Sequence, residues 1–304
     1  MSEALKPYRV AEQALWSKFG ASPTERFADL ESGLRVRIQE VGAGPSVVFV
    51  HGVMTAGSVF APLVAHLSGV RSIVLDRPGC GLSPPWQLHA RFRNQAVEVI
   101  RELLDAVQLD SVVLAGNSLG ALWVTWFALA HPSRVRKLVL LGPSIGFPGA
   151  RVPGFMRIAA IPGVGALIKR KMRTSHASLR RIFAEMGHQK SLDGGKIPEA
   201  FFDWGVRLDD TGTSRHDFDA ILRAVGFTGA RRWIQLEESE LQSLSMPTLV
   251  LAGTDDSHGG PALAARIAEL IPHATLQILK DAGHIPWVDN ASAVAEPLRR
   301  FVME

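Results

Sequence analysis

The chain has 304 residues, a formal net charge of +4, 47% hydrophobic residues and 20% charged residues. This composition excludes a disordered chain, and the length is sufficient for two domains or for one α/β domain with an insertion. The single cysteine, Cys80, excludes an intramolecular disulfide and favours a reducing compartment. The first residues lack the apolar core of a secretory signal, so we expect a soluble, cytoplasmic protein.

The first third of the chain predicts a helix, a hairpin and two buried strands before a second helix. Residues 3–19 are amphipathic at helical spacing, and residues 27–41 alternate loosely around a Ser-Gly turn, as in a β-hairpin. The short apolar runs at residues 47–50 and 72–76 are typical of strands buried on both faces of a parallel sheet. Residues 92–108 again show helical periodicity.

Strand and helix continue to alternate at residues 112–130, and residues 136–141 form another apolar run. The pattern then breaks into helical pieces punctuated by Gly and Pro, and it returns at residue 247. This order predicts an α/β fold, a doubly wound and mostly parallel sheet, with a helical lid inserted after the sixth strand. We assign residues 1–145 and 236–304 to the core, and residues 146–235 to the lid.

A possible nucleophile lies in the G-x-S-x-G pattern of residues 116–120, centred on Ser118. An uncharged strand precedes the pattern and an apolar helix follows it. A serine on such a strand-to-helix turn projects its hydroxyl above the sheet edge, beside the first N–H groups of the helix. The context therefore favours a nucleophilic serine over an ordinary turn.

A serine nucleophile needs a base and an orienting carboxylate. Asp255 and Asp256 follow one predicted strand, and His284 follows the last one, so all lie at the same sheet edge as Ser118. His258 is a rival base beside the proposed acid. His51 is a second rival, but a histidine before a glycine at a strand end more often bonds locally and shapes its loop.

In these motifs the chain resembles the α/β-hydrolase superfamily, in the branch of lid-bearing esterases, lactonases and meta-cleavage-product hydrolases. The resemblance covers residues 46–145 and 236–302. It depends on His51-Gly52, Asp76 to Ser83, Gly116 to Gly120, Gly253 to Asp256 and Gly283-His284.

The resemblance implies a catalytic triad of Ser118, Asp256 and His284, with Asp255 as the alternative acid. It also implies an oxyanion hole formed by the backbone N–H groups of Val53 and Leu119. A serine at residue 118 distinguishes the chain from relatives that place an aspartate there. We expect no organic cofactor and no metal.

The predicted reaction is hydrolysis of a carboxylic ester, lactone or thioester of a hydrophobic small molecule through an acyl-enzyme. The alternative is hydrolysis of a carbon–carbon bond in a meta-cleavage product, and a third hypothesis is a lid-gated binding protein with a residual triad. Residues 147–235 carry a net charge of +7. The basic residues either form a solvated helix face or attract anionic substrates. We expect a small-molecule substrate and neither nucleic acid nor membrane as a partner.

Overall fold

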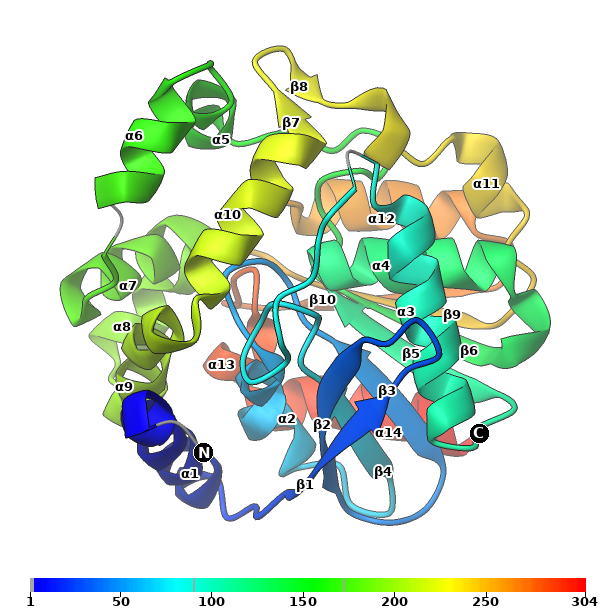
Figure 1. Ribbon diagram of the computed structural model, residues 1–304. Coiled ribbons are helices and arrows are strands. Elements are labelled where there is room, and N and C mark those ends of the chain that lie inside the picture. The colour runs from blue at the N-terminus through cyan, green and yellow to red at the C-terminus, as the bar shows by residue number, and fades with distance from the viewer. Residues whose placement is uncertain (1–2, 90, 172) are drawn as a thin grey trace.

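The computed structural model describes residues 3–89, 91–171 and 173–304, and an eight-stranded sheet forms its centre (Figure 1). The strand order is β1-β2-β4-β3-β5-β6-β9-β10. β2 is antiparallel to both of its neighbours, and all pairings from β4 to β10 are parallel. The strands are β1 (Thr24–Asp29), β2 (Arg35–Val41), β3 (Ser46–Val50), β4 (Arg71–Leu75), β5 (Val112–Asn117), β6 (Val135–Leu141), β9 (Thr248–Gly253) and β10 (Ala274–Leu279).

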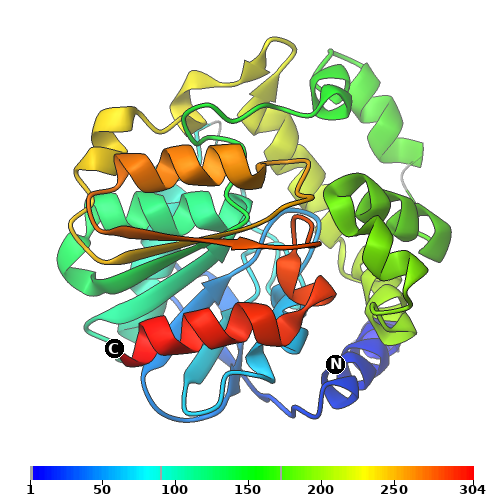
Figure 2. The ribbon, with the colours of Figure 1, turned by 180° about the vertical axis from the view of Figure 1, so that it is seen from behind.

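Helices cover both faces of the sheet, as Figures 1 and 2 show from opposite sides. Because successive strand residues point to opposite faces, Val48 and Val50 pack in one core cluster while Val47 and Phe49 pack in the other. The first cluster includes α3 (Arg93–Ala106), α4 (Leu119–Ala130), α11 (Glu238–Gln242) and α12 (Gly260–Leu270). The second includes α1 (Lys6–Lys18), α2 (Ala61–Val64), α13 (Pro286–Asp289) and α14 (Ala291–Met303).

A mainly helical segment connects β6 to the last part of the sheet, and we call residues 146–235 the insert. It lies beside the sheet in Figure 1, and the N-terminal helix α1 packs against its helix α9. The insert contains α5 (Gly154–Ala159), α6 (Val164–Lys171), α7 (His176–Phe183), a π-helical turn (Ala184–His188), α8 (Gln189–Asp193), α9 (Glu199–Arg207), α10 (Thr213–Ala224) and a ribbon of β7 (Val225–Gly226) and β8 (Gly229–Ala230).

The predicted α/β fold with a mostly parallel sheet is confirmed. The first helical stretch of the insert consists of two separate helices, α5 and α6. Pro162 and Gly163 lie between them, and Gly163 has a φ of 83°, which ends a right-handed helix. Among the helices of the described residues, none is both long and apolar enough to cross a bilayer.

Candidate active site

Ser118 lies on a sharp turn between β5 and α4. Its backbone has a φ of 54° and a ψ of −117°, which is a strained conformation for a residue with a side chain. A Cβ at Gly116 would lie 2.3 Å from the Gly120 carbonyl oxygen, and one at Gly120 would lie 2.0 Å from the Val50 carbonyl oxygen. Both glycines are therefore needed for the close approach of the backbones around the serine.

The predicted acid and base come from the loops after β9 and β10, and their side chains are in contact. His284 Nδ1 lies 3.1 Å from each carboxylate oxygen of Asp256, and both side chains are buried. Asp255 instead pairs with Lys190 at 3.0 Å. Of the two aspartates that the sequence leaves open, Asp256 is the one that contacts the histidine.

The surroundings of Asp256 favour its charged form. Burial alone raises the pKa of a carboxyl, but the charge and hydrogen bond of His284 and two backbone N–H groups lower the pKa of Asp256 to about 2. Those N–H groups belong to His258 and Gly259, at 2.8 and 3.1 Å from Oδ1. Asp256 is therefore ionised at neutral pH and suited to orient an imidazole and to stabilise its protonated form.

The hydroxyl of Ser118 and the imidazole of His284 line the same cavity. In this structure Ser118 Oγ forms a hydrogen bond of 3.2 Å with the buried Ser144 Oγ rather than with His284. Ser144 follows β6, and nothing in the sequence marked it. Catalytic hydrogen bonds of unliganded enzymes are often long and shorten only when a substrate binds.

The predicted oxyanion hole consists of the backbone N–H groups of Val53 and Leu119, and both residues belong to the described part of the chain. Val53 and Leu119 both line the cavity with Ser118. Leu119 begins α4, so its N–H has no partner within the helix. Among the hydrogen bonds of the described residues, neither N–H has a protein acceptor, and both are therefore free to bind an anionic oxygen.

His51 is held by its own loop. Its Nδ1 lies 2.8 Å from the Gly52 carbonyl oxygen, and its Nε2 accepts a 3.0 Å hydrogen bond from the Arg77 N–H. Burial, together with the nearby charge of Arg77, lowers its pKa well below the ordinary value. Both ring nitrogens are occupied, which fits a structural histidine and not a catalytic base.

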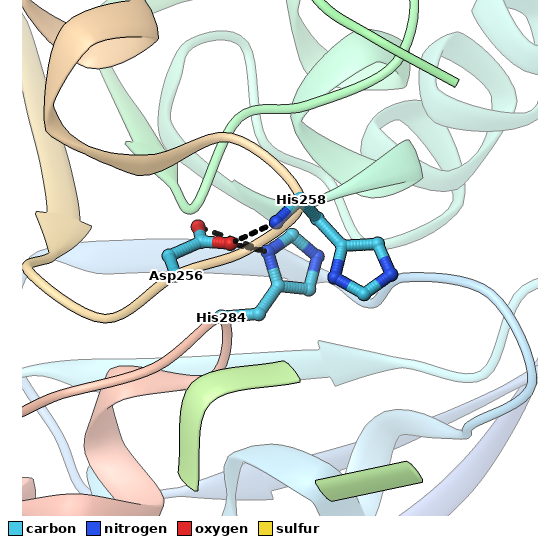
Figure 3. A group of neighbouring side chains, drawn as sticks. All are labelled: Asp256, His258 and His284. Carbon is cyan, nitrogen blue, oxygen red and sulfur yellow. Dashed lines mark hydrogen bonds and ion pairs between the residues drawn. The ribbon is translucent and has the colours of Figure 1, made fainter. Parts of the chain in front are cut away.

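Figure 3 shows His258 next to His284, and both residues line the same cavity. The rings of His258 and His284 have centroids 4.8 Å apart, and burial lowers the pKa of His258 to about 4, to which the charge of His284 contributes. One donor atom from each of Asp256, His258 and His284 lies within 4.8 Å of the others. A metal ion there would compete with the three hydrogen bonds that already occupy Asp256 Oδ1, so the group fits an acid–base pair better than a metal site.

The cavity has a volume of about 740 Å³ and a mainly apolar lining. A pocket of this size holds a drug-sized molecule. Arg151 and Arg173 also line it, and neither has an ion-pair partner among the described residues. Its apolar insert residues include Phe155, Met156, Phe183, Met186, Phe201, Phe202 and Trp204.

The matching family model is described as the alpha/beta hydrolase fold and covers residues 45–291. The chain therefore belongs to the α/β-hydrolase fold family, and its sheet and flanking helices agree with that assignment.

The chain is also similar to particular hydrolases. It is 28% identical over 293 residues to a 2-hydroxy-6-oxononadienedioate/2-hydroxy-6-oxononatrienedioate hydrolase of Pseudomonas putida, covering 92% of this chain and 96% of that one. The naproxen esterase of Bacillus subtilis has a TM-score of 0.76 at 19% identity, covering 99% of both chains. The enol-lactonase of Burkholderia xenovorans LB400 has a TM-score of 0.70 at 21% identity, covering 92% of this chain and 100% of that one. These two structures support the fold alone.

Proposed function

We propose that the chain is a serine hydrolase that cleaves a carbon–carbon bond next to a ketone in a small, largely apolar substrate of the meta-cleavage type. The observation that carries the proposal is the convergence of Ser118, the His284–Asp256 pair and two free N–H groups on one cavity. The choice of bond follows from the full-length similarity to hydrolases of 2-hydroxy-6-oxo dienoic acids. The sequence alone favoured ester hydrolysis over carbon–carbon bond hydrolysis, and the similarity to these hydrolases reverses that order.

The proposed mechanism begins when the 2-hydroxydienoate tautomerises to its keto form, with the enol proton moving to the carbon beside the ketone. His284 Nε2 then takes the proton of Ser118, and the serine oxygen attacks the ketone carbon. The carbonyl oxygen becomes an oxyanion and accepts hydrogen bonds from the N–H groups of Val53 and Leu119. As the carbonyl re-forms, the carbon–carbon bond breaks and its electron pair moves onto the conjugated dienolate. Protonated His284 returns its proton to this leaving group.

The second half of the proposed reaction frees the enzyme. His284 removes a proton from water, the hydroxide attacks the acyl carbon, and Ser118 leaves with the proton that His284 returns. The products are a carboxylic acid and a shortened enol. Asp256 remains ionised throughout and stabilises the imidazolium that forms in each half.

Hydrolysis of an ester or lactone is the second candidate, because the same groups perform it with an alkoxide as leaving group. The mainly apolar lining of the cavity suits an uncharged ester or lactone. Arg151 and Arg173 favour a substrate that carries an anionic group, such as the carboxylate of a dienoic acid.

The test compares wild type with Ser118→Ala on 2-hydroxy-6-oxo-2,4-heptadienoate, on p-nitrophenyl butyrate and with a fluorophosphonate label. Ser245→Ala, which changes an exposed serine shortly before β9, is the control. We expect labelling and loss of dienoate absorbance with wild type and the control, and neither with Ser118→Ala. Turnover of the ester alone favours the second candidate, and an unlabelled wild type contradicts both.

A further inference from the structure

Helix α10 of the insert is attached by polar contacts to two core loops beside the candidate oxyanion hole. The Gly81 N–H donates to Thr213 Oγ1 at 2.8 Å, and Trp86 Nε1 donates to His216 Nε2 at 3.1 Å. The docking is also close, because a Cβ at Gly79 would lie 2.4 Å from the His216 ring. The first half of α10 is therefore fitted onto the loop that follows β4.

The centre of this contact is a fully buried ion pair. Arg77 Nη2 donates to both carboxylate oxygens of Asp217, at 3.0 and 2.8 Å, and Asp217 is not exposed to solvent at all. Burial opposes the charge on Arg77, but the nearby Asp217 raises its pKa above the ordinary value. Removing one partner of such a deeply buried ion pair strongly destabilises the fold, because the other charge stays buried without a counter-ion.

Asp217 also binds the loop that carries Val53. Its Oδ2 accepts a 2.6 Å hydrogen bond from the Met54 N–H. Met54 has a φ of 56°, a conformation that is unfavourable for a residue with a side chain and needs support from its surroundings. Asp217 supplies a charged acceptor at that residue.

Arg77 holds the same loop from the other side of Val53. Its Nη2 donates to the Gly52 carbonyl oxygen at 2.7 Å, and its Nε donates to the His51 carbonyl oxygen at 3.1 Å. Val53 thus lies between a carbonyl group held by Arg77 and an N–H group held by Asp217. The direction of the Val53 N–H depends on both contacts.

We infer that Asp217 is a positioning residue that aims the Val53 N–H at the oxyanion, so that docking of α10 and formation of the oxyanion hole are a single event. The inference depends on the proposed function. On this inference, the insert helps to form the active site. When α10 is displaced from the core, the Met54 N–H loses its acceptor and the Val53 N–H is no longer oriented toward the oxyanion. Asp217 touches no substrate and acts only through the loop.

The test compares Asp217→Asn with Asp219→Asn on the substrate that wild type turns over. Asp219 is a matched control because it lies on the same helix, partly exposed, and pairs with Lys169 at the surface. We expect Asp217→Asn to lower kcat about 100-fold with KM unchanged, as a small misplacement of a catalytic group does. Its affinity for phenylboronic acid, which adds to Ser118 as a tetrahedral anion, should fall by a similar factor, whereas Asp219→Asn should match wild type.

A folded Asp217→Asn variant with wild-type kcat and wild-type boronate affinity overturns the inference, and so does an equal loss with Asp219→Asn. An inactive, unlabelled wild type counts against the proposed function instead. If Asp217→Asn does not fold, hydrogen exchange on wild type decides the matter. We expect the Met54 amide, which donates to Asp217, and the amides of α10 to be protected to the same degree, and rapid exchange of the Met54 amide beneath a protected α10 contradicts the coupling.

Discussion

Asp255 and Asp256 are adjacent carboxylates with different partners, which makes them a natural pair of variants. We expect Asp256→Asn to lower kcat by roughly 10⁴-fold, because an amide favours the wrong imidazole tautomer. The Asp255→Asn variant lacks the ion pair with Lys190, whose side chain is more than half exposed. The kcat of this variant should therefore stay close to that of wild type. Steady-state rates at neutral pH measure both, and equal losses would contradict the assignment of Asp256 as the acid.

His258 gives the candidate site a pH-dependent stability. Its pKa is about 4 in the folded chain and about 6.5 in the unfolded chain. Between these values the unfolded chain binds a proton that the folded chain does not, so stability falls as the pH is lowered from about 6.5 towards 4. His51 and His216, whose pKa values are also lowered, contribute in the same direction.

We therefore expect His258→Gln to reduce the loss of unfolding free energy between pH 7 and pH 5 by about 1–2 kcal/mol. Urea unfolding at the two pH values measures this difference. His176→Gln, which changes a half-exposed histidine of α7, is the control. An unchanged pH dependence in His258→Gln would show that its imidazole is solvated and protonates normally.

At the scale of whole elements, the π-helical turn of the insert is joined to the loop that carries His284. The His284 N–H donates to the Met186 carbonyl oxygen at 3.0 Å, and the Ile285 N–H donates to His188 Nε2 at 3.2 Å. The other ring nitrogen of the fully buried His188 lies 2.8 Å from Asp289 Oδ2. The insert therefore contacts the backbone on both sides of the base.

His188→Ala removes the imidazole that contacts the Ile285 N–H and the Asp289 carboxylate, and both groups are buried. We expect the free energy of unfolding to fall by about 3 kcal/mol and kcat to fall as the His284 loop relaxes. Urea unfolding and steady-state kinetics measure the two effects. His176→Ala, on a half-exposed side chain of α7, should change neither, and wild-type values in His188→Ala would remove His188 from any role in this loop.

The strands, the serine turn and the acid–base pair could each be predicted from the sequence, but for different physical reasons. Buried strands are read from continuous apolar runs, and the G-x-S-x-G turn from the close backbone approach that Gly116 and Gly120 allow. Loops at the carboxyl ends of parallel strands meet at one edge, which places Asp256 and His284 together. The division of the chain at residues 145 and 235 stays a prediction.

The contacts between the insert and the core could not be predicted from the sequence. Asp217 meets Arg77 across 140 residues, and His188 meets Asp289 across 101 residues. Neither spacing is periodic, and Asp217 and His188 alone resemble ordinary polar residues of a helical segment. Ser144 was missed for the same reason, because only the return of the chain after β6 brings it to Ser118.

At the scale of the whole molecule, Arg37 on β2 joins three parts of the chain through a buried group of charges. It contacts Glu12 of α1 at 2.5 Å, Glu25 of β1 at 2.6 Å and Asp76 after β4 at 3.1 Å. Burial raises the pKa of Asp76, and the charge of Arg37 opposes that shift. The N-terminal helix is thus held to the sheet beneath the loop that begins with Arg77.

We expect Arg37→Met to lower the free energy of unfolding by about 3–5 kcal/mol, because it leaves buried carboxylates without their counter-ion. Arg35→Met is the matched control: Arg35 lies on the same strand, its ion pair with Asp29 is mostly exposed, and its removal should cost less than about 0.5 kcal/mol.

Because α1 also packs on α9 of the insert, through Tyr8 and Trp204, release of α1 should loosen the insert as well. Urea unfolding measures the first effect, and hydrogen exchange in α9 measures the second. Equal stabilities of the two variants would mean that α1 is held by its apolar contacts alone.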